Sequence, residues 1–444
     1  MLKRFSLENF SSYKEENYLD LTAGRTESHL SHLYDFKKVK LLKSAIIYGA
    51  NASGKSNLIR AMEYAKNIIT ENLNEINTYK KYFRLDKESS TKPTQFEFEL
   101  ELNNKFYSYG FSSILQNKKI EEEWLYEIGK SSPELIFERK INKIKLGSKL
   151  LKNEKIKDRF EIYIDDMKNQ SYQLFLSEIA NKDLDNLEVK ILNDIYNWFD
   201  KKLVILYPNT KYGNLSSIGS DENLSKIFKQ HLKSFDTGIV DVSSIEEDFE
   251  QTFKEFPNDF KIEIEKDLAE DSDKKVILRG SDGLFLTIYK DKNDELKIQK
   301  LGLIHSKEID DIFELQDESD GTKRLFDLIP LITKFNADYT IVIDEFDRSL
   351  HPMLTKAFFE LFYKLNDSKS QLIVSSHEST LLDLELLRRD EIWFAEKDKY
   401  GATKLFSLNQ FKERYDKKIE KAYLLGRYGA IPIFKSFDEI DMEN

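Results

Sequence analysis

One eight-residue run, Gly49-Ala50-Asn51-Ala52-Ser53-Gly54-Lys55-Ser56, constrains the fold of this chain more than any other feature. It fits the pattern G-x-x-x-x-G-K-[ST], in which a glycine-rich loop joins a strand to a helix. The apolar run from Lys43 to Tyr48 predicts the strand, and residues 57–65 predict the start of the helix. Free N–H groups and the helix dipole favour an anion at such a junction. The run therefore predicts a phosphate-binding loop within an α/β domain.

Each position of this loop has a chemical role in holding a nucleoside triphosphate. Gly49 and Gly54 let the backbone curl around phosphate groups, because glycine has no Cβ in the way. Lys55 is expected to reach the β- and γ-phosphates, and Ser56 is expected to ligate Mg²⁺. The residues expected to bind the nucleotide are Gly49, Ala50, Asn51, Ala52, Ser53, Gly54, Lys55, Ser56 and Asn57.

A second segment, far along the chain, has the features of the part of such a site that binds the metal ion and activates the attacking water. The apolar run Tyr339–Ile343 is followed by Asp344 and Glu345. Such runs are typical of buried parallel strands, and ligands bind beyond the carboxyl ends of these strands. Asp344 is expected to hold Mg²⁺, and Glu345 to activate the attacking water as general base. The alternative is an ordinary strand that ends in an acidic turn.

A third segment places a histidine at the end of another apolar run. Residues 371–376 read as a buried strand, and His377 follows them. A histidine there can donate a hydrogen bond to a γ-phosphate oxygen and so respond to its presence. The spacing from Glu345, one helix plus one strand, favours this catalytic role. A lone histidine with purely structural contacts is the alternative.

A fourth segment predicts a second anion site. Ser319, Gly321 and Thr322 begin a helical pattern that continues through Leu325, and Ser319 is a plausible N-cap. Pro330 lies inside the pattern, so the helix is expected to kink or to end early. One nucleotide does not need two γ-phosphate sites in one chain. We therefore expect a head-to-tail dimer in which this element closes over the partner's phosphate loop, although a simple capped helix is the alternative.

The order of these motifs resembles that of the ABC-type ATPases, which include the structural-maintenance-of-chromosomes proteins, RecF and the overcoming-lysogenization-defect nucleases. The run Leu350-His351-Pro352 is part of this order, and the opening Met1–Tyr13 resembles the first strand of that class. The run Asp344–Pro352 and the ending Tyr423–Pro432 resemble a bacterial family of stand-alone AAA-type ATPases related to the overcoming-lysogenization-defect group. Its members resemble the ATPase halves of phage-defence and abortive-infection systems. The resemblance covers roughly residues 1–115 and 300–435.

This resemblance implies the fold and the cofactors. The expected fold is an α/β, ABC-type P-loop ATPase head, with a mixed sheet, helices and an antiparallel β subdomain, interrupted by an inserted α+β lobe. The implied cofactors are ATP and Mg²⁺. The element Ser319-Asp320-Gly321-Thr322 departs from the Ser-Gly-Gly-Gln of the wider class, and the charge of Asp320 could weaken dimer closure. Gln173 is only a weak candidate for the glutamine loop, and an exposed helical glutamine is the preferred interpretation.

The expected domain organisation is a split ATPase domain, formed by residues 1–118 and 301–444, around an inserted lobe, residues 119–300. Alternating apolar and polar residues on either side of Asn103-Asn104 predict an antiparallel hairpin. Within the insertion, residues 155–200 are helical in pattern. Residues 261–265 and 284–289 are predicted to be short strands.

Charge and composition limit the possible partners. The net charge is −11, which does not indicate a dedicated nucleic-acid binder, and the basic segment 138–155 is more typical of a solvated helix or hairpin face. The chain has no cysteine, lacks an N-terminal signal pattern and has no apolar run long enough to span a membrane. We therefore expect a cytoplasmic protein that does not enter membranes.

Three functions remain open at this stage. The preferred one is an ATP-driven switch that forms a homodimer or larger homo-oligomer and controls a separately encoded effector, a nuclease or toxin, for which a Toprim-like nuclease is one option. Too few residues follow His377 for a further domain of ordinary size, so the effector is expected on another chain. The alternatives are a RecF-like DNA-repair clamp and a scaffold that sequesters a partner until hydrolysis releases it.

Overall fold

The computed structural model describes all residues except 130–131, 142, 152–153, 169, 181, 183–188, 212–217, 219–220, 255–256, 270–274, 281–284, 292, 309–310, 412–418 and 432–444. The chain divides into two compact units. Unit 1 comprises Met1–Pro208, Phe335–Arg348 and Thr355–Asn444, and unit 2 comprises Asn209–Lys334 and Ser349–Leu354. The P-loop and the Asp344 strand both belong to unit 1.

The first sheet of unit 1 is the mostly parallel sheet predicted from the apolar runs. Its first five strands are parallel to their neighbours, and only the last pair is antiparallel. All three predicted strands that lead to the site are buried along their whole length, which explains their continuous apolar sequences. In spatial order the strands are β11 (Leu203–Leu206), β17 (Thr340–Ile343), β18 (Gln371–Ser375), β5 (Ser44–Tyr48), β19 (Ile392–Lys397) and β20 (Thr403–Ser407).

The second sheet of unit 1 is antiparallel and contains the predicted hairpin. Asn103 and Asn104 both have positive φ, 51° and 60°, as a tight two-residue turn requires. Strands β6 and β7 run on either side of this turn, so the hairpin prediction is confirmed. In spatial order the strands are β10 (Lys143–Leu146), β9 (Pro133–Lys140), β8 (Lys119–Ile128), β7 (Lys105–Ile114), β6 (Thr94–Leu102), β1 (Leu2–Glu8) and β2 (Asn17–Asp20).

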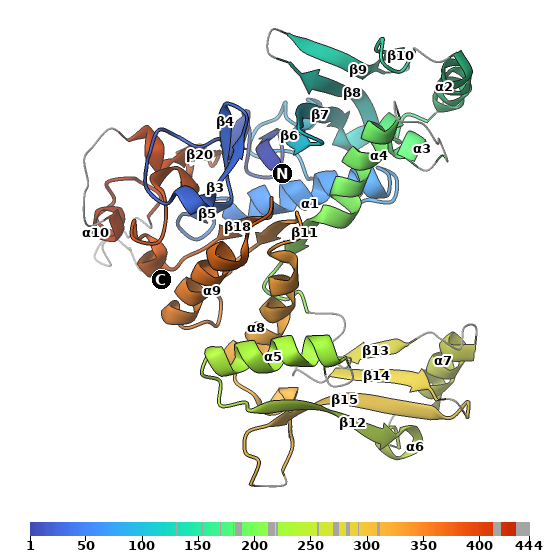
Figure 1. Ribbon diagram of the computed structural model, residues 1–444. Coiled ribbons are helices and arrows are strands. Elements are labelled where there is room, and N and C mark those ends of the chain that lie inside the picture. The colour runs from blue at the N-terminus through green and yellow to red at the C-terminus, as the bar shows by residue number, and fades with distance from the viewer. Residues whose placement is uncertain are drawn as a thin grey trace, which may run out of the picture. The chain divides into compact units, whose positions relative to one another are not determined.

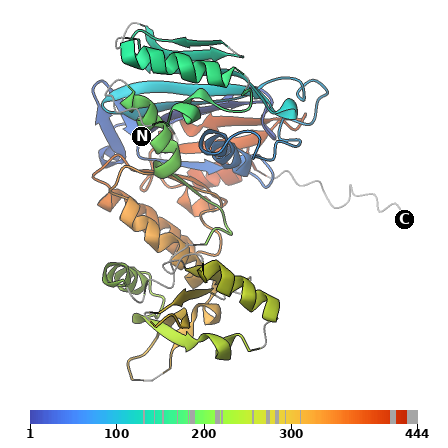
Figure 2. The same ribbon diagram turned by 90° about the vertical axis from the view of Figure 1, so that its right-hand side faces the viewer.

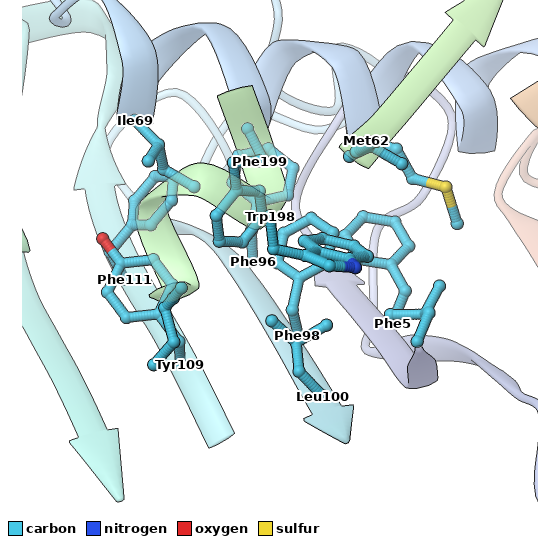
Figure 3. Packing of buried hydrophobic residues seen from close by; sticks show 14 of the residues in the cluster. Phe5, Met62, Ile69, Phe96, Phe98, Leu100, Tyr109, Phe111, Trp198 and Phe199 are labelled. Atoms are coloured by element: carbon cyan, nitrogen blue, oxygen red, sulfur yellow. The ribbon is translucent and has the colours of Figure 1, made fainter. Parts of the chain in front are cut away.

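Helix α1 (Lys55–Thr70) lies between the two sheets and joins their cores (Figures 1 and 2). Met62 and Ile69 of this helix are buried together with the aromatic rings of the antiparallel sheet, as Figure 3 shows. The rings of Phe5 and Phe98 lie 4.6 Å apart, centroid to centroid. Packing on both sides fixes the helix, and therefore fixes the phosphate loop at its N-terminus.

Shorter elements complete unit 1. The predicted helical region forms α2 (Glu154–Met167), α3 (Phe175–Ala180), α4 (Lys190–Asn197) and a π-helical turn (Trp198–Lys202). The remaining elements are the β3 (Leu33–Phe36) and β4 (Val39–Leu42) pair, α9 (Pro352–Leu365), which belongs to unit 1 from Thr355 onward, α10 (Ile419–Leu424) and the 3₁₀ turns Leu30–His32, Leu115–Asn117, Ser379–Leu381, Arg389–Glu391 and Leu408–Gln410.

The C-terminal motif packs on the parallel sheet. The rings of Tyr423 and Tyr428 stack on Phe394 of β19, with centroids 5.6 and 5.5 Å away. The Glu396 carboxylate, which ends the apolar part of β19, accepts a hydrogen bond from the Ala430 N–H at 3.2 Å. The acidic end of this strand therefore anchors the motif. The last residue of the quoted motif, Pro432, lies outside the described residues.

Unit 2 has its own sheet and core. Strands β12 (Asp241–Asp248), β15 (Leu296–Ile304), β14 (Phe285–Lys290) and β13 (Val276–Arg279) form an antiparallel sheet, and β16 (Phe313–Glu314) pairs with β15. The helices are α5 (Glu222–Ser234), α6 (Phe249–Thr252), α7 (Asn258–Ala269) and α8 (Asp320–Leu328). One 3₁₀ turn, Leu315–Asp317, precedes α8, and another, Ile329–Lys334, follows it. Helix α8 ends two residues before Pro330, as the proline predicted.

Two expectations differ from this architecture. The predicted strand 261–265 is wrong, because these residues lie in helix α7. The compact units also have other boundaries than the expected domains. Strands β8–β10 fall within the expected insertion, but they pair with β7 in the antiparallel sheet of unit 1. Backbone hydrogen bonds between neighbouring strands thus cross the expected boundary at residue 118. No helix among the described residues combines the length and apolar character needed to cross a membrane.

Candidate functional site

The phosphate loop joins β5 to α1, as the sequence predicted. Gly54 has a φ of 111°, a conformation that favours glycine, and a Cβ there would collide with the Thr403 side chain. A Cβ at Gly49 would collide with the main-chain oxygen of Ala395 and with Ser53 Oγ. The backbone therefore curls in a space that side chains at these positions would fill.

Segments from both ends of the chain hold the loop in this shape. The Thr403 hydroxyl lies 2.8 Å from the main-chain oxygen of Ser53 and 2.8 Å from Ser12 Oγ. Tyr13 donates its hydroxyl proton to the main-chain oxygen of Gly54 at 3.2 Å. Ser12 and Tyr13 belong to the opening segment that carried the family resemblance, but the sequence assigned a role to neither residue.

Lys55 lies across the loop. Its ammonium group donates to the main-chain oxygens of Gly49 at 2.7 Å and Ala50 at 3.2 Å. Burial lowers its pKa from 10.5 to about 8, while the carboxylates of Asp344, Asp347 and Glu345 act in the opposite direction. A partly desolvated ammonium group interacts strongly with phosphate, because little water competes with the anion.

Ser56 and Asp344 meet at the end of the sheet. Ser56 Oγ donates to Asp344 Oδ1 at 3.1 Å, and Ser375 Oγ donates to the same oxygen at 2.5 Å. The Asp344 side chain is buried, so these contacts place a carboxylate beside the first turn of α1. A hydroxyl and a carboxylate are oxygen ligands of the kind that Mg²⁺ prefers.

Glu345 is held at the rim of the site by its main chain. Its φ is 47°, which is unusual for a residue with a Cβ, and its N–H donates to Ser375 Oγ at 2.8 Å. Its carboxylate remains partly exposed and lies 3.9 Å from the guanidinium group of Arg348. The carboxylate is thus accessible to a water molecule, as the predicted general base must be.

His377 lies beside Lys55. The distance from Lys55 Nζ to His377 Nδ1 is 3.5 Å. The pKa of His377 is lowered, because its ring is partly withdrawn from water and because the Lys55 ammonium group is close. The main-chain N–H of His377 points to the Asp347 carboxylate, with distances of 3.3 and 3.2 Å to its two oxygens. Asp347 thereby fixes the backbone of the histidine loop.

The residues present fit a triphosphate with Mg²⁺. Among the described residues, Ser53 Oγ is buried inside the loop without a hydrogen-bond partner. The first turn of α1 has no side-chain cap, so its N–H groups are available to an anion. An orphaned hydroxyl, uncapped N–H groups and a buried ammonium group together form an anion cradle. Ser56 and Asp344 would hold the metal beside this cradle.

The structure brings together most of the predicted residues. Lys55, Ser56, Asp344, Glu345 and His377 lie around the end of one sheet, as expected. Within the predicted nucleotide-binding run Gly49–Asn57, Asn51 and Ala52 are exposed. The side-chain amide of Asn57 donates to Ser12 Oγ at 2.8 Å, so in this structure it supports the opening segment.

The element with Ser319, Gly321 and Thr322 is in unit 2. Ser319 caps α8 as predicted, since its Oγ accepts from the Thr322 N–H at 3.2 Å. The two hydroxyl groups also lie 3.0 Å apart. A Cβ at Gly321 would press on the main-chain oxygen of Ser349, which explains the glycine. The role of this element opposite a partner's nucleotide stays a prediction.

Five residues that shape the site were not predicted from the sequence: Ser12, Tyr13, Thr403, Asp347 and Ser375. Ser375 lies two positions before the predicted His377, and Asp347 lies two positions after the predicted Glu345. This proximity in the sequence could have indicated that both residues lie at the site. Thr403 follows no recognisable motif, so only the fold reveals it. Gln173 is not helical but precedes α3, where its amide donates to Glu178 at 3.2 Å. This contact gives no support to a glutamine loop.

Comparison with protein families identifies the chain. Residues 44–383, more than three quarters of the chain, match the family described as "AAA domain, putative AbiEii toxin, Type IV TA system". The chain belongs to this family. The P-loop and the Asp344-Glu345 strand both lie within the matched region. This P-loop ATPase family agrees with the resemblance found in the sequence.

Two solved structures of low sequence identity are similar to the chain. One is the SMC head bound to the C-winged helix domain of ScpA, with 13% identity, a TM-score of 0.42, and coverage of 91% of this chain and 97% of that chain. The other is the SMC head domain from Thermotoga maritima, with 12% identity, a TM-score of 0.36, and coverage of 91% and 98%. No curated protein matches the sequence.

Proposed function

We propose that this member of the family is an ATP-hydrolysing molecular switch that closes as a homodimer and controls a separately encoded effector. The observation that supports hydrolysis is the meeting of Ser56 with Asp344, next to Glu345 and His377. A metal ligand pair, a general base and a histidine next to the P-loop lysine are the parts that phosphoryl transfer to water requires.

The side chains have separate tasks in this proposal. The loop N–H groups and Lys55 bind the phosphates, and Ser56 with Asp344 would hold Mg²⁺, which neutralises charge on the phosphates when bound. Glu345 accepts a proton from the attacking water, which its exposed carboxylate is placed to orient. These tasks need no covalent intermediate on the protein.

His377 acts as a neutral hydrogen-bond donor. Its lowered pKa leaves the imidazole uncharged at pH 7. Because an ammonium group can only donate, the proximity of Lys55 to Nδ1 favours the tautomer that carries its proton on Nε2. The Nε2–H group is then available to donate a hydrogen bond to a γ-phosphate oxygen. This hydrogen bond is lost when the cleaved phosphate leaves the site.

Dimer closure adds the second anion site. Ser319, Gly321 and Thr322 of one protomer would face the γ-phosphate of its partner, with the N-terminus of α8 as the binding element. Hydrolysis removes the charge that bridges the protomers, so the dimer opens. Asp320, in the first turn of α8, adds a negative charge near that phosphate and is expected to slow closure.

The family description supports an effector in a toxin or abortive-infection system. We place that effector, a nuclease or toxin, on another chain and assign a role in anti-phage defence to the pair. The experiment is a tagged pull-down of Glu345→Gln from the native host in ATP and Mg²⁺. Lys55→Met with the same tag is the matched control, because it should not bind ATP.

The outcomes of this pull-down differ clearly. A stoichiometric second protein with Glu345→Gln but not with Lys55→Met supports the effector proposal. A bare dimer that carries DNA contradicts it and favours the repair-clamp alternative. A partner that binds both variants equally contradicts control by ATP.

A further inference from the structure

The hydroxyl group of Ser375 bridges the two acidic residues of the site. It donates to Asp344 Oδ1 at 2.5 Å and accepts from the N–H of Glu345 at 2.8 Å. The main-chain oxygen of Ser375 also accepts from the N–H of Phe346 at 3.0 Å. Ser375 ends β18 and is completely buried. One residue of β18 therefore holds three consecutive residues that follow β17.

Proton counting fixes the direction of this bridge. A serine hydroxyl has one proton to donate and two lone pairs that accept. The Glu345 N–H can only donate, so Ser375 must accept there and give its own proton to Asp344. The Asp344 carboxylate thus accepts from two hydroxyl groups, and a carboxylate oxygen is the kind of ligand that a divalent cation binds.

The bridge also determines which carboxylate oxygen is free. Within the described part of the chain, the hydrogen bonds of the Asp344 carboxylate from Ser56 and Ser375 both go to Oδ1. Oδ2 therefore keeps its lone pairs for a metal ion. Without Ser375, rotation of the carboxylate would meet less resistance, because one of its two anchors would be lost.

The same hydroxyl supports an unfavourable backbone conformation. Glu345 has a φ of 47°, in the left-handed region that residues with a Cβ rarely adopt. A residue keeps such a conformation only where several surrounding contacts hold its backbone in place. The bond from the Glu345 N–H to Ser375 and the neighbouring bond from Phe346 supply this support, and they direct the Glu345 side chain to the rim of the site.

We propose that Ser375 is a positioning residue that aligns the metal ligand Asp344 with the general base Glu345. The inference rests on the proposed ATPase function and adds a residue to it. Ser375 touches neither nucleotide nor water in this scheme. It acts by fixing one carboxylate through its proton and the other through the backbone.

The chain offers a matched control at the other end of the same strand pair. Ser370 is also completely buried, stands just before β18, and accepts from the N–H of Tyr339, just before β17, at 3.1 Å. Ser370→Ala therefore removes a buried serine hydroxyl with the same kind of backbone contact. It does so at the amino ends of the strands, whereas the P-loop site lies at their carboxyl ends.

The experiment compares full-length Ser375→Ala, Ser375→Thr and Ser370→Ala. It measures kcat and KM for ATP, and the affinity for a fluorescent ATP analogue with and without Mg²⁺. For Ser375→Ala we expect kcat to fall about 100-fold, as for misplaced catalytic groups. Its Mg²⁺-free binding should stay at the wild-type level while the gain in affinity on adding Mg²⁺ shrinks. Ser375→Thr keeps the hydroxyl and should recover part of both losses.

The control separates positioning from stability. Ser370→Ala should lower the thermal midpoint as much as Ser375→Ala but keep wild-type kcat and Mg²⁺ response. If Ser375→Ala and Ser370→Ala behave alike in both assays, the proposal for Ser375 is overturned. If instead Glu345→Gln hydrolyses ATP like wild type, the proposed function fails. The Mg²⁺ response still tests the Ser375–Asp344 contact in that case, because it requires no turnover.

Discussion

Ser56 Oγ donates a hydrogen bond to Asp344 Oδ1 at 3.1 Å, although 288 positions separate the two residues in the chain. Parallel strands explain the contact. Strands β5, β18 and β17 are neighbours in one sheet and run in the same direction, so the segments that follow them meet at one edge. The start of α1 and the end of β17 thereby form one site from two distant parts of the sequence.

The contact predicts a metal-dependent phenotype for Ser56→Ala. We expect this variant to bind an ATP analogue normally without Mg²⁺, because the loop N–H groups and Lys55 remain. With Mg²⁺, its affinity should be at least tenfold weaker than wild type, a loss of about 1.4 kcal/mol. Titration calorimetry with and without Mg²⁺ measures both values. Equal losses in the two conditions would contradict a metal role for Ser56.

The lowered pKa of Lys55 predicts a pH dependence of nucleotide binding. The folded protein holds this pKa at about 8, below the ordinary 10.5, so the ammonium form is complete well below pH 8. Above pH 8 the charged fraction falls up to tenfold per pH unit, and affinity for an ATP analogue should fall with it. Binding measured from pH 7 to 9.5 checks the slope.

The unliganded protein should show the opposite trend in stability. Because the folded pKa is lowered, the unfolded chain binds more protons at Lys55 between pH 8 and 10.5. The contribution of this residue to the free energy of unfolding therefore rises with pH in that window. Lys55→Met should remove this stability slope, and a variant that keeps the slope would assign it to another group.

Gly54→Ala tests the shape of the phosphate loop. The added Cβ would collide with Thr403 and would impose a φ of 111° on alanine, so we expect a stability loss of about 2 kcal/mol and loss of ATP binding. Gly238→Ala is the control. Gly238 has a φ of 78°, but its Cβ would meet only His305 at 3.5 Å. Both variants share the backbone strain, but only Gly54→Ala adds the collision. Denaturant unfolding and analogue binding should therefore show a larger loss for Gly54→Ala than for Gly238→Ala.

The sequence predicted those parts of the site that depend on local patterns. Gly49–Ser56 and Asp344-Glu345 each follow an apolar run, and a buried parallel strand allows little other than such a run. The contacts of Ser12 and Thr403 with the loop could not be predicted. They come from opposite ends of the chain, and neither residue type is informative by itself.

The wrong strand at 261–265 has a different cause. Alternating isoleucine and glutamate suggested one buried face of a strand, but a helix also buries residues four apart. Ile264 and Leu268 are buried with Phe260 packed beside them, whereas Ile262 is 60% exposed. The spacing 260, 264 and 268 therefore decided the structure, and the alternation within it was incidental.

Mixing two inactive variants tests the predicted sharing of sites between protomers. Lys55→Met removes the ammonium group with which the P-loop binds ATP. Ser319→Arg places a bulky side chain where a partner's γ-phosphate would lie. Each variant alone should hydrolyse ATP at least 100-fold more slowly than wild type. A dimer of one protomer of each kind has one complete site, with the P-loop from the Ser319→Arg protomer and Ser319 from the Lys55→Met protomer.

An equal mixture should therefore recover about one quarter of wild-type activity, since half of the dimers are mixed and each of these has one of two sites intact. One variant carries a tag, so a mixed dimer differs in mass from both homodimers. Measuring the mass of the complexes therefore checks that mixed dimers form. Mixed dimers without recovery would show that α8 does not complete a partner's site. Recovery requires that the two halves of one catalytic site come from two chains, because neither variant carries both.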